Sequence, residues 1–151
     1  MKGGKHVFGW AKVSHTGEIP IPQEALEEYQ LQPSNKVIII NGSKTSGGFS
    51  MVTIEKLINS PLSIVLENNP KLATFQLSNG ESIQYKNRFY CWTEISQDGK
   101  IHLPIETLKI YGINPGALVL SVRGSGLGVG FIVRGPIIKE AEKHPELTIV
   151  E

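Results

Sequence analysis

Apolar positions along this chain come in short segments interrupted by turn residues, a pattern typical of a mainly β protein with short helices. Some segments are rich in aromatic and β-branched side chains, and others are continuous apolar runs like those of buried strands. Six of them predict β-strands: residues 6–14, 37–40, 49–53, 88–96, 118–122 and 131–134.

Two short helices are predicted between these strands, at residues 23–29 and 105–111. Each follows a proline, which favours a helix start because its φ is already fixed near the helical value. In the first segment Ala25, Leu26 and Tyr29 fall on one face and glutamates on the other. A non-helical loop over the same residues remains the alternative.

The pattern also predicts how each half of the chain ends. A closing strand is expected at residues 63–66 and another at residues 148–150. Residues 72–77 and 82–86, joined by an Asn-Gly turn, predict an inserted hairpin between the halves. This hairpin is interpreted as a linker with local pairing, and a functional arm is the alternative.

The two halves are copies of one repeat. When residues 8–49 are placed on residues 90–131, 14 of the 42 positions are identical without a gap. Chance would give roughly 2–3 identities at ordinary residue frequencies. The identical pairs include Trp10 and Trp92, Gly17 and Gly99, Pro22 and Pro104, Tyr29 and Tyr111, and Phe49 and Phe131. We call the halves copy one and copy two, and we call residues paired by this alignment equivalent.

Composition narrows the function classes. The 151 residues carry 15 Lys+Arg against 14 Asp+Glu, a net charge of +1, which excludes a protein that coats nucleic acid by bulk charge but allows a local basic face. The single cysteine cannot form an internal disulfide, and the four histidines lack zinc-site spacing. Because no run of 18 apolar residues and no signal sequence is present, we expect a cytoplasmic protein without a membrane partner.

Each copy carries the motif G-x-I-x-[IL]-P-x-E-x-L-x-x-Y-x-[IL]-x-P, followed by an apolar strand. In this order and spacing the motif resembles the swapped-hairpin domain of AbrB, SpoVT and MazE-like proteins. The matching stretches are residues 17–37 and 99–119. The expected organisation is a first repeat at 1–66, a connecting hairpin at 67–87 and a second repeat at 88–151.

The resemblance implies how the copies assemble. One β-α-β-β unit of about 45 residues buries too little apolar surface to be stable alone. In the family, two units interleave their hairpins into one β-barrel, normally as a homodimer. Because both units are present here in one polypeptide, we expect one pseudo-two-fold barrel per chain, with Trp10 and Trp92 at equivalent positions.

The resemblance also implies DNA binding and transcription regulation, since family members of that type contact DNA through Arg and Lys on the first hairpin and the adjoining helix. At those sites this chain has Glu18 and Glu27 in copy one, and Lys100 and Lys109 in copy two. Phosphate contact requires cations, because neutralised phosphates release counterions. The candidate contacts with double-stranded DNA are therefore Lys100, Lys109, Arg123, Arg134, Lys12 and Lys44.

Two interpretations compete with DNA binding. In the first, these cations are ordinary solvated surface charges without a partner. The glutamate-rich helix of copy one also departs from the family pattern. The alternative function is a non-catalytic module on the same barrel that binds a protein or small ligand, or that self-associates.

Catalytic and cofactor sites have little support in the residues. The glycine loop 124–130 leads into a predicted strand rather than a helix, so a glycine-rich hairpin is favoured over an anion site. Cys91 lies in a predicted strand and is interpreted as a small core residue rather than a nucleophile. Trp10 and Trp92 are interpreted as core anchors rather than stacking platforms for single strands. No catalytic residue, metal or cofactor is expected, and the chain is not expected to be an enzyme.

Overall fold

A computed structural model describes residues 6–124 and 128–151. Within them the chain is mainly β with short helices, as predicted. Copy one and the connecting segment contain β1 (Val7–Lys12), β2 (Glu18–Pro20), α1 (Gln23–Glu28), β3 (Lys36–Asn41), β4 (Phe49–Thr53), α2 (Ile54–Ile58), α3 (Ser63–Asn68), α4 (Pro70–Ala73) and β5 (Ile83–Tyr85). Copy two contains β6 (Arg88–Glu94), β7 (Lys100–His102), α5 (Ile105–Ile110), β8 (Leu118–Arg123), β9 (Val129–Ile132), α6 (Pro136–Ala141) and β10 (Ile149–Val150).

The six strands predicted within the repeated stretches and the two proline-led helices are confirmed, with bounds that differ by a few residues. Helix α1 follows Pro22 and buries Ala25 while its glutamates stay exposed, as the amphipathic pattern requires. Helix α5 follows Pro104 and buries Leu108 in the same way. The non-helical alternative for the first of these segments is therefore wrong.

Strands of copy one pair mainly with strands of copy two. Eight strands form one mostly antiparallel sheet in the order β10-β1-β8-β9-β4-β3-β6-β5, and β2 pairs with β7 in a second small sheet. In the β1–β8 pair Trp10 lies opposite Leu120, and in the β3–β6 pair the equivalent Trp92 lies opposite Ile38. Both tryptophans thus occupy equivalent positions in the pairing, as predicted.

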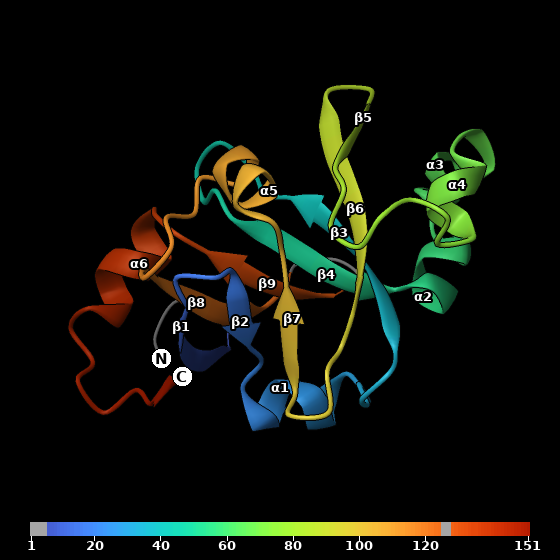
Figure 1. Ribbon diagram of the computed structural model, residues 1–151. Coiled ribbons are helices and arrows are strands. Elements are labelled where there is room, and N and C mark those ends of the chain that lie inside the picture. Colours follow the sequence, from blue (N-terminus) through green and yellow to red (C-terminus); the bar gives the residue numbers. More distant parts are fainter. Residues whose placement is uncertain (1–5, 125–127) are drawn as a thin grey trace.

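At two places, a residue of copy one pairs with its own equivalent in copy two. Phe49 pairs with its own equivalent, Phe131, across β4 and β9, and the two rings stack with centroids 5.0 Å apart. Ile19 pairs with its equivalent, Ile101, across β2 and β7. The copies are therefore related by a pseudo-two-fold, and Figure 1 shows α1 and α5 on opposite sides of the β2–β7 pair.

The main apolar core belongs to both copies, and two satellite clusters flank it. Residues from both copies fill the main cluster, including Phe49 and Phe131. One satellite lies under α2, α3 and α4, and the other lies under α6. The tryptophans are half-buried against these satellites: Trp92 against the first and Trp10 against the second. Each therefore anchors a satellite cluster rather than the shared core.

The closing strand predicted at residues 63–66 is wrong, because this segment is helix α3. In copy two the corresponding strand, β10, pairs with the outer edge of β1. By the same symmetry, the closing segment of copy one would pair with the outer edge of β6, the strand of copy two that is equivalent to β1. That edge is already occupied by β5. The segment instead turns helical and buries Val65 and Leu66 in the satellite cluster.

The inserted hairpin at residues 72–77 and 82–86 is also wrong in its partners. Leu72 is buried in α4, and β5 pairs with β6 of copy two rather than with residues 72–77. The Asn-Gly turn is present, and Gly80 docks on copy two by accepting a hydrogen bond from Thr107 Oγ1. The observed hairpin is therefore β5–β6, which rises from the body of the molecule in Figure 1.

The large sheet is open at both ends, with β10 on one edge and β5 on the other. No closed barrel is detected in the part of the chain that the structure describes. Of the glycine loop at residues 124–130, residues 125–127 lie outside the described part. No helix among the described residues is both long and apolar enough to cross a bilayer.

Candidate nucleic-acid interface

Three of the six predicted contact residues lie together at one end of the molecule. Arg134 follows β9, and its Nε donates a hydrogen bond to the carbonyl of Lys44, 3.1 Å away, in the β3–β4 loop. The Arg134 guanidinium also lies beside Gly112, the residue that hydrogen-bonds back to the carbonyl of Lys109 on α5. We call Lys44, Lys109 and Arg134 the basic cluster.

A glycine in the β3–β4 loop makes the approach of Arg134 possible. A Cβ placed on Gly47 would lie 2.7 Å from one guanidinium nitrogen and 2.6 Å from the Val133 side chain. Gly47 also has φ of +63°, a conformation that glycine adopts without steric cost. This glycine therefore shapes the loop so that a guanidinium from copy two lies against copy one.

The basic cluster carries positive charge without neutralising partners. All three side chains belong to exposed residues. Within the described chain, none of them forms a salt bridge with a carboxylate. The nearby acidic residue on α5 is Glu106, in the first turn of the helix. This end of the molecule is therefore suited to an anionic partner.

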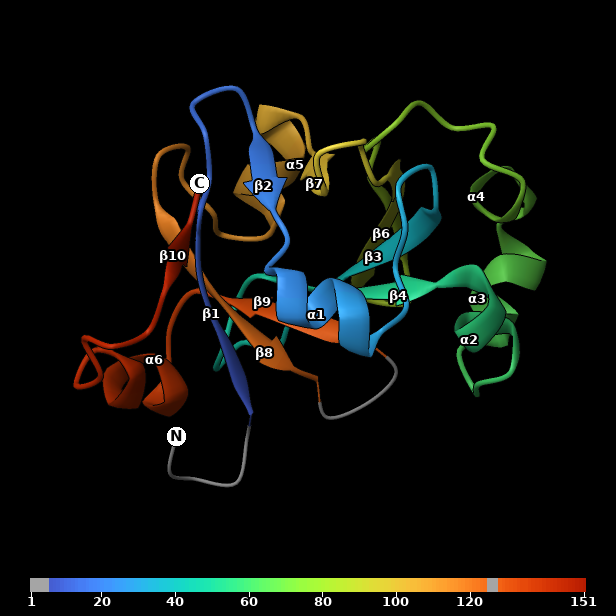
Figure 2. The same ribbon diagram turned by 90° about the horizontal axis from the view of Figure 1, so that it is seen from below.

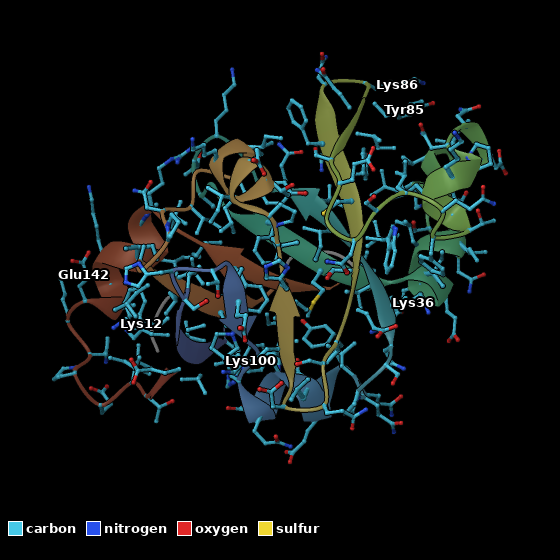
Figure 3. All side chains as sticks on the ribbon, viewed as in Figure 1. Lys12, Lys36, Tyr85, Lys86, Lys100 and Glu142 are labelled. Atoms are coloured by element: carbon cyan, nitrogen blue, oxygen red, sulfur yellow. The ribbon has the colours of Figure 1, made fainter. Side chains whose placement is uncertain are left out.

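The other three predicted contact residues lie elsewhere and are paired. Lys12 contacts Glu151 at 3.5 Å, and Lys100 contacts Asp98 at 3.9 Å. Figure 3 shows Lys12 and Lys100 away from the end that carries the basic cluster. The six residues therefore do not form one continuous face.

Arg123 forms a bidentate ion pair. Its guanidinium donates hydrogen bonds to both carboxylate oxygens of Glu28, at the end of α1. These hydrogen bonds lower the pKa of the Glu28 carboxyl and raise that of the guanidinium. Figure 2 shows the α1 side of the molecule facing the viewer, opposite the end that carries α5.

The resemblance stated above predicts DNA contacts on the hairpin that carries β2 in copy one and on the hairpin that carries β7 in copy two. Here Glu18 lies opposite His102 in the strand pairing, and Pro20 lies opposite Lys100. The His102 ring is held by a 2.8 Å hydrogen bond with the carbonyl of Thr16. Charges of both signs share this face, so it lacks the uniform positive charge that phosphate binding favours.

Cys91 is a buried core residue, as predicted. Its sulfur lies 3.4 Å from the hydroxyl oxygen of Tyr111, and burial raises the pKa of the thiol to about 12. The thiol is therefore protonated at neutral pH, whereas an activated cysteine needs a lowered pKa. Among the described residues, no group of three His, Cys, Asp or Glu is placed to hold a metal ion.

A cleft of about 1140 Å³ lies beside α1, between residues 30–36, residues 53–56 and the hairpin tip at residues 97–99. Two lysines on its wall are held over aromatic rings: Lys56 is 5.0 Å from the centroid of Tyr29, and Lys36 is 5.6 Å from that of Phe75. Its wall also carries acidic residues, Glu27, Glu55 and Asp98. The wall of the cleft therefore carries both positive and negative side chains.

Sequence reasoning missed two cations, Lys86 and Arg88, at the tip of the β5–β6 hairpin. Both are exposed, and neither forms a salt bridge within the described chain. The signal was the Lys86-Asn87 pair between two strand-like segments, since asparagine is a favoured hairpin-turn residue.

Comparisons with protein-family models, with curated proteins and with solved structures found no match to this chain.

Proposed function

We propose that this chain is a DNA-binding, regulatory protein whose two copies exchange hairpins within one polypeptide, as the units of AbrB-like proteins do, around an open sheet. The repeated motif supports the family assignment. The strand pairing supports the exchange of hairpins, because β1 pairs with β8, β3 with β6, and β2 with β7 across the two copies. In this proposal the two-fold homodimer of the family is replaced by two unequal halves.

The observation that carries the proposal is the basic cluster. Lys44, Lys109 and Arg134 come from three segments that meet at one end of the molecule, where Arg134 contacts the Lys44 carbonyl and lies beside Gly112, and none has a carboxylate partner among the described residues. Unpaired cations at a surface attract phosphates, and each phosphate that they neutralise releases condensed counterions. Lys12, Lys100 and Arg123 contribute less because carboxylates already pair with them.

Binding on this surface is one-sided. The position equivalent to Lys109 is Glu27, and extending the alignment by three residues without a gap places Val52 opposite Arg134. A homodimer would present the same cations twice and read two half-sites related by its symmetry. This chain presents them once, so its site on DNA needs no palindrome.

Fluorescence anisotropy with a labelled random-sequence duplex over a salt series tests the proposal. Three neutralised phosphates alone predict a slope of log K against log salt of about −2.7. K109Q together with R134Q should make the slope shallower by about 1.8. Each lost contact should weaken binding by about 15-fold near 50 mM salt, since a slope of 0.9 acts over the roughly 20-fold range to 1 M.

K12Q together with K100Q is the matched control, because it removes the same net charge from paired positions. It should leave the slope nearly unchanged. If the wild type binds no duplex near 50 mM salt at tens of micromolar protein, the proposal fails. A consensus site selected from a random duplex library would support the regulatory role.

The cleft beside α1 favours a second candidate, a binding module for a basic peptide or a small cation. Glu27 and Glu55 on its wall are exposed and form no salt bridge within the described chain. Its two lysines lie over aromatic rings, and Lys36 also pairs with Glu94 at 3.4 Å. Calorimetric titration with a lysine-rich peptide tests this candidate, and E27Q together with E55Q should abolish any heat of binding.

A further inference from the structure

The β5–β6 hairpin has a short, well-defined tip. Tyr85 pairs with Arg88 across the strands, so Lys86 and Asn87 alone form the turn. Both have positive φ, +47° and +68°, as the type I′ turn of a two-residue hairpin requires. Glycine and asparagine are the usual residues there. The chain instead places a lysine at the first position, where a Cβ makes the conformation less favourable.

The hairpin is braced along its length. Asn68, at the end of α3, donates a 2.7 Å hydrogen bond to the Tyr85 hydroxyl. Ile83 and Tyr85 pack against the satellite cluster under α2, α3 and α4. At the base, Phe89 N–H donates to Asn41 Oδ1 at 2.8 Å. The hairpin is therefore a supported projection, and we call it the β5–β6 arm.

The tip of the arm is positively charged. Lys86 and Arg88 are exposed and have no carboxylate partner in the described chain. The Lys86 ammonium lies 5.5 Å from the centroid of the Tyr85 ring. Figure 3 shows Tyr85 and Lys86 at the tip, clear of the molecule's main body.

The arm and the basic cluster occupy the same end of the molecule. The base of the arm is bonded to Asn41, after which the chain enters the loop that carries Lys44. Figure 1 shows the arm, α5 and the β3–β4 loop together along the upper edge. The basic cluster together with Lys86 and Arg88 thus places five cations along one edge. The acidic residue of α5, Glu106, lies in the first turn of that helix.

We propose that the β5–β6 arm enters the major groove of duplex DNA while the basic cluster holds the neighbouring phosphates. This inference rests on the proposed function and assigns its mode of contact. The major groove, about 12 Å wide, admits a two-stranded β-ribbon. Lys86 neutralises phosphate at the groove edge, Arg88 donates to the N7 and O6 acceptors of guanine, and Asn87 bonds adenine.

The first test is the salt series with K86Q together with R88Q. Five phosphate-facing cations predict a wild-type slope of about −4.5, and the double variant should give about −2.7. The matched control is K71Q together with K139Q, which removes the same charge from exposed lysines on α4 and α6. It should keep the wild-type slope. Circular dichroism confirms that both double variants fold.

The second test uses duplexes in which 7-deazaguanine replaces guanine, which removes the N7 acceptor from the major groove and changes neither charge nor the minor groove. Wild-type affinity should fall roughly fivefold, since the bidentate contact of Arg88 with guanine loses one of its two acceptors. R88Q should bind the two duplexes equally. Equal binding by the wild type would overturn the major-groove assignment.

The outcomes separate the two proposals. If the wild type binds duplex and K86Q with R88Q binds equally well, the arm proposal fails and the proposed function stands. If the wild type does not bind, both fail. If the arm variant instead abolishes concentration-dependent self-association in light scattering, with no effect on DNA affinity, the arm contacts a second copy of the chain and the proposal is overturned.

Discussion

At the end of α1, Glu28 accepts both hydrogen bonds of Arg123, and the ion pair neutralises that corner of copy one. At the equivalent place in copy two, Ile110 stands for the glutamate and Asn41 for the arginine. Ile110 is 40% exposed, and Asn41 is engaged in holding the arm. The place occupied by the Glu28–Arg123 ion pair at one end of the molecule therefore has no ion pair at the other end. There, Asn41 supports the arm beside the basic cluster.

The copies differ far less where they contact each other. Phe49 pairs with Phe131, and Ile19 with Ile101, and all four side chains are at most 1% exposed. In a homodimer, a surface change at one end also appears at the other, because both subunits share one sequence. Fusion removes this constraint from the ends but not from the shared core, which each copy must still complete for the other.

Separating the copies should have the largest effect. In residues 1–83 expressed alone, β1, β2, β3 and β4 each lose a partner strand from copy two. We expect this half to aggregate, to remain unfolded or to homodimerise, as measured by size exclusion and NMR. A well-dispersed spectrum from a monomer would contradict the shared core.

Truncating either of the two stacked phenylalanines, Phe49 of copy one or Phe131 of copy two, should lower stability by nearly the same amount. F49A and F131A each remove a fully buried ring, and we expect each to lower the free energy of unfolding by about 3–5 kcal/mol. The double variant should lose less than the sum, because the rings are in contact. Urea denaturation measures all three. Costs that differ by several kcal/mol would show that the copies contribute unequally to the core.

The elements common to both copies could be predicted from sequence, because strand patterns, proline-led helices and turn glycines recur at fixed spacing. Segment 63–66 could not, since Ile64, Val65 and Leu66 suit a strand or a buried helix face equally. Its structure depends on β5 having taken the edge of β6, a contact between segments that no local pattern records.

The candidate interface was predicted only in its residue types. Arg123 and Arg134 read alike in the sequence, yet one is neutralised by Glu28 and the other approaches Gly47 and Gly112 without a carboxylate partner in the described chain. Glu28 and Arg123 are 95 residues apart, so their pairing follows only from the way the copies interleave. Charge counting along the chain therefore overestimated the continuous basic face.

Transferring the charges of copy two to copy one should have an intermediate effect. E18K together with E27K places lysine at the positions equivalent to Lys100 and Lys109. We expect tighter duplex binding and a slope steeper by up to about 0.9, since only position 27 corresponds to an unpaired lysine, whereas position 18 lies on the mixed-charge face of β2 and β7. The matched control is E67K together with E142K, on α3 and beside α6. Equal strengthening by the control would show that net charge, and not position, governs affinity.

The smallest expected effect is a pH dependence of the protein's stability, which arises at His144 in copy two. His144 follows α6 in copy two and lies between Glu146 and Glu140, at 2.6 and 3.4 Å, whereas residues 59–68 after α2 in copy one contain no histidine. Its hydrogen bonds to these carboxylates raise the pKa of the imidazole above its usual value near 6.5. A raised pKa in the folded state means that the stabilisation is fully present below the unfolded value and is lost as pH rises through the folded one.

Melting temperatures at several pH values between about 5.5 and 8.5 measure this contribution, above the range in which the glutamates titrate. The wild type should lose a small increment of stability as the pH rises, and H144L, which removes the titrating imidazole, should lack that increment. The hydrogen bonds lie in and just after α6, so the pH-dependent part should not change the slope of DNA binding. An identical pH dependence in H144L would assign the titration to another group and leave the ends of the two copies alike in this respect.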